Sequence, residues 1–318
     1  MNLPSLVPSR PLDGDGDGAG WRLIDVPERG TTFAYDRRHL SRSAPTVVLL
    51  HGWTATGSLN WSATIAALEV RYRVVALDHR GHGRGIRGDR TFSLEDCADD
   101  VAALLAVLGV RRAVFVGYSM GGPVAQLIWR RHRHLVDGLV FCATASDFTS
   151  PHVDEQLLRA VDEMWRATGP IRRSTQISKQ VVSHLLEVAP IGNQLVEALA
   201  RHDDDAIHGA GLAIGRFCST EWITSVDVPV VVIVTSRDRL VRPAQQWQLA
   251  ALISQARTIT VDAGHFAPFR QPELIAGAVT ASCDSITQPS IGNRLRRAAR
   301  VARRLVARHR ARAKLIRV

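Results

Sequence analysis

Long apolar runs are missing from this 318-residue sequence, since no stretch holds 18 consecutive apolar residues. A helix that crosses a bilayer needs about 20 such residues, so a transmembrane helix is excluded. The first four residues show neither the cationic start nor the apolar core of a secretory signal, and we expect none. Cysteines are few and have no C-x-x-C spacing, which predicts no zinc site, no disulfide framework and a cytoplasmic location. The four are Cys97, Cys142, Cys218 and Cys283.

Acidic residues are absent from residues 294–318, whereas this segment holds eleven lysines and arginines. The whole chain has a net charge of +10, so the rest has a net charge of −1 once these eleven cations are removed. A nearly neutral body is not expected to bind nucleic acid. Apolar residues make up 46% and charged residues 22%, close to the globular average, which excludes global disorder.

Residues 13–18 repeat Asp-Gly three times, as at the start of an EF-hand calcium loop. The last position of such a loop would be Ile24, where calcium needs a bidentate Glu, and no flanking helices are predicted. We therefore interpret residues 1–20 as a flexible leader without a metal ion.

Strand and helix patterns alternate along most of the remaining sequence. Strands are predicted at 21–26, 31–35, 46–50, 72–77, 113–116, 138–142, 230–234 and 258–261, and helices at 93–108, 122–133, 243–253 and 272–282. The first two strands form a predicted hairpin. The alternation predicts the α/β class, with a mostly parallel central sheet and helices on both faces.

One segment, from about residue 147 to 224, shows only helical patterns. These lie at 153–167, 174–188, 192–202 and 206–217. An insertion after the sixth strand of a parallel sheet lies over the carboxyl ends of the strands, where ligands bind in such sheets. We therefore expect one domain over residues 21–287 that carries a helical cap.

Residues 117–121 read Gly-Tyr-Ser-Met-Gly, a G-x-S-x-G pattern between a predicted strand and a predicted helix. A sharp turn there exposes the central side chain, and the two glycines avoid clashes with the neighbouring strand and helix. The turn also puts Ser119 at a helix N-terminus, which favours developing negative charge. Ser119 is therefore the candidate nucleophile.

A serine nucleophile needs a base, and the base needs an orienting acid. His265 follows the last predicted strand and Asp238 follows the strand before it, so both fall at the same sheet edge as Ser119. Asp147, after the sixth strand, is the alternative acid. Asp262 is too close to His265 in sequence to orient it.

Acyl transfer also needs donors for the oxyanion. We expect one to be the amide of Met120, next to the nucleophile. The other is expected from the loop after Leu50, where Gly52 permits close approach and the Trp53 amide is the candidate. The side chain of His51 is interpreted as structural.

Together these residues resemble the α/β-hydrolase superfamily over about residues 21–287. The matching pieces are residues 51–53, 78–83 and 117–122, with Asp238 and His265. The resemblance implies that residues 78–83 form a structural loop at the pocket edge. Haloalkane dehalogenases and epoxide hydrolases carry Asp at the nucleophile position. Ser119 therefore points to the esterases, lipases, carbon–carbon-bond hydrolases and cofactor-free haloperoxidases.

The residues and the resemblance predict a serine hydrolase acting on a small-molecule carboxylic ester with an apolar acyl or alcohol part. The chemistry proceeds through an acyl-enzyme that water hydrolyses, and it requires no metal or organic cofactor. Two alternatives stay open. The same triad could support perhydrolysis with halide oxidation or carbon–carbon cleavage, or the fold could bind a ligand without catalysis.

Residues 288–318 form a predicted linker and a basic amphipathic tail. On a helix, eight apolar residues of the tail fall within an arc of about 120°. They are Leu295, Ala298, Ala299, Ala302, Leu305, Val306, Ala313 and Ile316. Peripheral binding to an anionic membrane, binding to a polyanion, and a frayed terminus are the three interpretations, and the apolar arc favours membrane over nucleic acid.

Overall fold

The computed structural model describes residues 20–37, 41, 43–88, 91–149 and 201–287. Within them, eight strands form one sheet in the order β1-β2-β4-β3-β5-β6-β7-β8. The strands are β1 (Trp21–Val26), β2 (Gly30–Arg37), β3 (Thr46–Leu50), β4 (Arg73–Leu77), β5 (Ala113–Tyr118), β6 (Val136–Cys142), β7 (Val230–Thr235) and β8 (Ala256–Val261). The predicted hairpin is confirmed as the antiparallel pair β1–β2, and β3 to β8 run parallel. The mostly parallel sheet confirms the predicted fold class.

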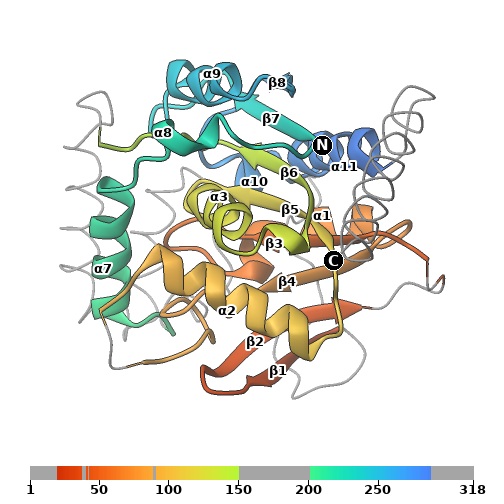
Figure 1. Cartoon of the computed structure of the whole chain (residues 1–318), viewed down its shortest axis with the longest axis vertical. Coiled ribbons are helices and arrows are strands. Elements are labelled where there is room, and N and C mark those ends of the chain that lie inside the picture. Colours follow the sequence, from red (N-terminus) through yellow and green to blue (C-terminus); the bar gives the residue numbers. More distant parts are fainter. Residues whose placement is uncertain (1–19, 38–40, 42, 89–90, 150–200, 288–318) are drawn as a thin grey trace, which may run out of the picture.

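Helices cover both faces of the sheet (Figure 1). They are α1 (Gly57–Leu68), α2 (Leu94–Val107), α3 (Gly121–Arg131), α7 (Asp204–Gly215), α8 (Thr220–Ile223), α9 (Pro243–Leu252), α10 (Ala267–Arg270) and α11 (Pro272–Thr287), with a short 3-10 helix at Arg133–Leu135. Strand side chains alternate between two cores. Val48 and Leu50 of β3 pack on the side of α2, α3 and α9, whereas Val47 and Leu49 pack on the side of α1 and α11.

Helix α1 is not predicted from the sequence. It begins after Thr56, whose hydroxyl accepts a hydrogen bond from the Leu59 amide at 3.2 Å. Its buried face mixes the polar Asn60 and Thr64 with Trp61 and Leu68. Because polar residues interrupt the apolar stripe, the periodicity that predicts the other long helices is weak here.

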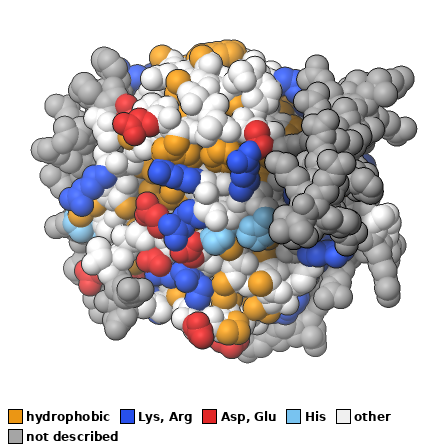
Figure 2. Space-filling model, viewed as in Figure 1, with side chains coloured by type: hydrophobic (Ala, Val, Ile, Leu, Met, Phe, Trp, Pro, Cys, Tyr) orange, Lys and Arg blue, Asp and Glu red, His pale blue; other side chains and the backbone are white. Residues whose placement is uncertain are grey.

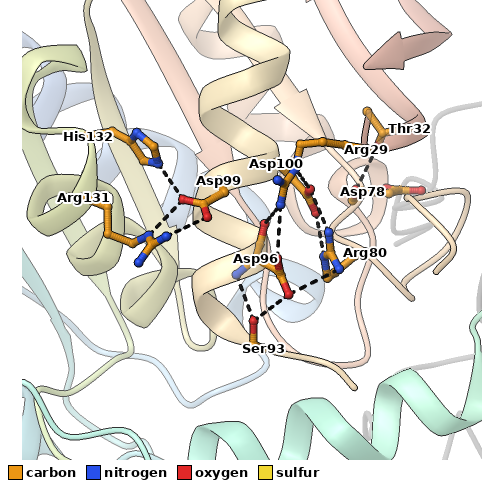
Figure 3. Close-up of polar contacts among 10 residues, drawn as sticks. All are labelled: Arg29, Thr32, Asp78, Arg80, Ser93, Asp96, Asp99, Asp100, Arg131 and His132. Carbon is orange, nitrogen blue, oxygen red and sulfur yellow. Dashed lines mark hydrogen bonds and ion pairs between the residues drawn. The ribbon is translucent and has the colours of Figure 1, made fainter. Parts of the chain in front are cut away.

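A network of ion pairs ties the first hairpin to α2 and to the loop after β4 (Figure 3). The buried carboxylate of Asp100 on α2 pairs with Arg29 from the hairpin turn and with Arg80 from the loop, the latter at 2.7 Å. Next to it, Asp99 accepts from Arg131 and contacts His132, which joins α2 to the end of α3. The loop after β4 is thereby fixed against the body of the sheet.

The surface seen in Figure 2 shows acidic and basic side chains side by side, with apolar areas between them. Among the described residues, no helix combines the length and the apolar character that a membrane crossing requires.

Of the inserted segment, the structure describes residues 147–149 and 201–224. Helix α7 (Asp204–Gly215) corresponds to the predicted helix at 206–217, and its start is fixed by Asp203, whose carboxylate accepts from the Ala206 amide. Residues 147 and 218 form an isolated antiparallel bridge, which the purely helical pattern did not predict. The leader, the helices predicted at 153–167 and 174–188, nearly all of that at 192–202, and the basic tail lie outside the described residues.

Candidate active site

Ser119 occupies a strained turn between β5 and α3. Its φ angle is +51°, in the left-handed region that non-glycine residues rarely adopt. A Cβ on Gly117 would meet the carbonyl oxygen of Gly121 at 2.2 Å, and a Cβ on Gly121 would meet that of Leu50 at 2.2 Å. Both glycines are therefore required for the turn, as the sequence pattern predicts. The turn leaves the Ser119 side chain half-buried at the carboxyl end of the sheet.

The structure brings the side chains of Ser119, His265 and Asp238 into one hydrogen-bonded chain. His265 Nε2 lies 2.9 Å from Ser119 Oγ, and His265 Nδ1 lies 2.8 Å from Asp238 Oδ2. The three residues follow β5, β8 and β7, whose carboxyl ends meet at the same edge of the sheet. The imidazole is 13% exposed and the carboxylate is fully buried, so of the two side chains only the imidazole is in contact with solvent.

The carboxylate of Asp238 is fixed by donors on both oxygens. Oδ2 accepts from the hydroxyl of Thr235 at 2.9 Å, and Oδ1 accepts from the amides of Leu240 and Val241, each at 2.9 Å. Hydrogen bonds to both oxygens fix the orientation of a buried carboxylate. Asp238 is therefore oriented toward His265 before any substrate binds.

The alternative acid, Asp147, lies in a different environment. Its Oδ1 accepts from the amide and the hydroxyl of Thr149, two residues along the chain. Asp262 pairs with Arg237 at the surface. Of the three aspartates, the structure brings only Asp238 to His265 within the described part of the chain.

The candidate oxyanion loop, defined here as residues 51–55, lies directly against the serine. A Cβ on Gly52 would stand 3.3 Å from the Cβ of Ser119, so glycine allows this approach. Neither the amide of Trp53 nor that of Met120 donates to a backbone carbonyl of another described residue. Both donors remain candidates for an oxyanion.

His51 is buried inside the fold, and both of its ring nitrogens form hydrogen bonds with backbone groups. Its Nε2 accepts from the amide of His79 at 2.9 Å, so the proton is on Nδ1, which donates to the carbonyl of Gly52 at 2.8 Å. This arrangement matches the structural role predicted for His51. It links the candidate oxyanion loop to the loop after β4, which the sequence resemblance assigns to the pocket edge.

Three buried histidines of these two loops are held neutral. Burial lowers the pKa of His79 to about 3 and that of His82 to about 4, and burial with the neighbouring imidazoles lowers the pKa of His51 well below its usual value. The rings of His51 and His79 lie 4.4 Å apart between centroids. Despite this cluster, no group of three or more side chains in the described ranges has an arrangement suited to a metal ion.

Two further side chains position the site and carry no signal in the sequence. The hydroxyl of Tyr118 donates to the carbonyl of His265 at 2.7 Å, and burial raises the pKa of this tyrosine well above its usual value. Asn60 accepts from the Gly52 amide through Oδ1 at 3.0 Å. Asn60 belongs to α1, the helix that the periodicity misses, so its role becomes visible only in three dimensions.

Comparison with known proteins identifies similar folds and sequences. The family model described as alpha/beta hydrolase fold matches residues 45–272. A probable oxidoreductase of Mycobacterium tuberculosis, EphD, is 26% identical over 292 residues, covering 81% of this chain and 48% of that protein. This chain therefore spans about half the length of such relatives, and their names describe longer proteins.

Two further matches concern ester chemistry. The bifunctional esterase/perhydrolase DCH of Acinetobacter calcoaceticus is 43% identical over 82 residues, which cover 26% of this chain and 29% of that protein. The enol-lactonase of Burkholderia xenovorans is 25% identical in its crystal structure, with a TM-score of 0.64, covering 82% of this chain and 98% of that one. Both matches are similarities to enzymes that act on esters, linear or cyclic.

Proposed function

Because this chain belongs to the α/β-hydrolase family, we propose that it hydrolyses carboxylic esters with an apolar acyl or alcohol part, with Ser119 as the nucleophile. The observation that carries the proposal is the hydrogen-bonded chain from Ser119 Oγ through His265 to Asp238. The activities for which two similar proteins are named, esterase and lactonase, support the choice of an ester as the substrate class.

In the proposed reaction, Ser119, His265 and Asp238 act together in two steps, the formation of the acyl-enzyme and its hydrolysis. Ser119 Oγ attacks the ester carbonyl while His265 Nε2 takes its proton, and His265 then gives that proton to the leaving alcohol. Asp238 keeps the proton of the neutral imidazole on Nδ1 and stabilises the imidazolium that forms. Water, deprotonated by His265, then attacks the acyl-enzyme and releases the acid and free Ser119.

The negative charge of the two tetrahedral intermediates requires donors beside Ser119. The amides of Met120 and Trp53 are proposed for this role. The oxyanion loop approaches Ser119 closely, which supports the assignment of Trp53, and Met120 follows the nucleophile at the start of α3. Each such donor contributes on the order of 10²–10³ in turnover in other acyl-transfer enzymes.

Hydrolysis of p-nitrophenyl esters of graded chain length tests this proposal. We expect Ser119→Ala to lower turnover by roughly 10⁴–10⁶-fold with an unchanged fold, because the binding site survives. A Ser119→Ala variant that retains a tenth of the activity would refute the proposed nucleophile. An inert wild-type protein that binds esters without turnover would support the non-catalytic alternative.

Perhydrolysis is a second candidate, favoured by the match to the esterase/perhydrolase of Acinetobacter calcoaceticus. In this reaction hydrogen peroxide replaces water in the attack on the acyl-enzyme, and the peracid that forms oxidises a halide. Halide-dependent chlorination in the presence of peroxide and acetate, lost in Ser119→Ala, would establish it. Carbon–carbon-bond hydrolysis has no comparable observation in its favour.

A further inference from the structure

The indole of Trp53 is bound to α7, the helix at the end of the inserted segment. Its Nε1 donates to the main-chain carbonyl of Ile207 at 2.9 Å. The six-membered part of the ring lies against Gly211, where a Cβ would stand 2.8 Å from ring atom Cζ2. The ring therefore fits against α7 because position 211 is glycine.

The next residue of the loop is bound to the same segment. Thr54 has a φ angle of +57°, an unfavourable conformation for a β-branched residue that persists only when neighbours hold it. His202 supplies such a contact. Its Nδ1 accepts from the Gly83 amide at 2.7 Å, so Nε2 carries the proton and donates to the carbonyl of Thr54 at 3.3 Å.

The first half of the oxyanion loop is held instead by the body of the domain. The amide of Gly52 donates to Asn60 on α1, and its carbonyl accepts from His51. The peptide N–H of Trp53 thus lies between two anchors, one on the sheet side and one on α7. A displacement of α7 relative to the sheet must change the direction of that N–H.

We propose that the Trp53 side chain couples helix α7 to the oxyanion hole, so that the position of α7 determines the direction in which the Trp53 N–H points. This inference rests on the proposed function, because it gives the amide a purpose only in stabilising an oxyanion. Trp53 then acts in two ways, through its backbone donor and through its indole as a positioning group. Through α7, the inserted segment then influences the rate of the chemical step.

Glycine substitutions on α7 separate this coupling from helix stability. Gly211→Ala should raise the intrinsic helix propensity of α7, yet its methyl group displaces the Trp53 ring. Gly215→Ala is the matched control, because a Cβ there meets no atom within 4 Å. We expect Gly211→Ala to lower kcat on a short ester about tenfold with KM changed less than twofold, and Gly215→Ala to leave both within twofold. Equal kcat values for the two variants would overturn the proposal.

A second pair of variants tests the indole hydrogen bond. Trp53→Phe keeps an aromatic ring but removes the Nε1 donor, and we expect a similar loss of kcat and a parallel loss of affinity for a boronic acid that forms a tetrahedral adduct. Trp129→Phe is the control, since its indole nitrogen has no partner among the described residues. A variant that melts at a lower temperature but keeps its kcat would show that the bond is only structural.

The Trp53 backbone amide resonance tests the coupling independently of ester hydrolysis. If the wild-type protein neither hydrolyses esters nor reacts with a fluorophosphonate, the proposed function fails, and the coupling is then read from the Trp53 backbone amide resonance. That resonance should shift in Gly211→Ala and stay in place in Gly215→Ala. An unshifted resonance in both variants would overturn the coupling itself.

Discussion

At the scale of single residues, the proposed role of Asp238 depends on its hydrogen bond with His265. It is the only described aspartate that forms a hydrogen bond with His265, and the other hydrogen bonds that its carboxylate accepts hold it in that orientation. We expect Asp238→Asn to lower kcat by on the order of 10³–10⁴-fold, because an amide at this position no longer fixes the proton of His265 on Nδ1.

Asp147→Asn is the control for this substitution, and we expect it to keep kcat within a factor of two or three. Both variants are measured on the same soluble ester, with circular dichroism to check folding. A mild Asp238→Asn and a damaging Asp147→Asn would place the acid after the sixth strand instead.

At the scale of elements, the turn between β5 and α3 determines where the serine lies. A methyl group at position 121 would meet the backbone of Leu50 at 2.2 Å, and a backbone atom cannot rotate away as a side chain can. We expect Gly121→Ala to lower the free energy of unfolding by about 1–3 kcal/mol and to displace Ser119. Gly277→Ala on α11, with open space around its Cβ, should instead be neutral or slightly stabilising. Urea unfolding of both variants measures the difference, and equal stabilities would contradict the required close approach.

Sequence patterns predict some of the elements and miss others. The strands and the amphipathic helices follow apolar periodicity, and the nucleophile turn follows its glycines, so both could be predicted. Helix α1 could not, because Asn60 and Thr64 interrupt its apolar face. The contacts of Tyr118 and Asn60 with the site could not either, since they join residues from separate elements that only the folded chain brings together.

At the scale of the whole molecule, the buried histidines make stability depend on pH. The folded pKa values of His51, His79 and His82 lie far below the unfolded value near 6.5, so below that pH the unfolded chain binds protons that the folded chain does not. Burial raises the pKa of Asp78 to about 6, which acts in the opposite sense below pH 6. The three histidines outweigh the one carboxyl, so the free energy of unfolding is expected to fall as the pH falls from 6 towards 4.

Urea unfolding midpoints measured between pH 7 and pH 4.5 test this dependence. We expect the midpoint to fall steeply below pH 6 and the fall to be less steep in His79→Phe, which removes one of the three histidines. A midpoint independent of pH over this range would contradict the account of the histidine cluster.

The basic tail concerns the whole chain, and its role remains a proposal from sequence. As a helix, residues 294–318 would be about 38 Å long. Half of its apolar arc is alanine, so binding to an anionic membrane would be weak and reversible. We expect the full chain to co-sediment with vesicles containing anionic lipid and a variant ending at residue 290 to remain in solution with its esterase activity intact. Equal sedimentation of both, or binding to DNA and not to vesicles, would exclude the membrane interpretation.

Covalent labelling reports whether His265 and Asp238 activate Ser119 as a nucleophile. The full chain is treated with a fluorophosphonate, digested and analysed by mass spectrometry. We expect a single adduct on the peptide that contains Ser119, absent in Ser119→Ala and formed far more slowly in His265→Ala. An adduct that persists in Ser119→Ala, or a wild-type protein that hydrolyses esters without being labelled at Ser119, would contradict it.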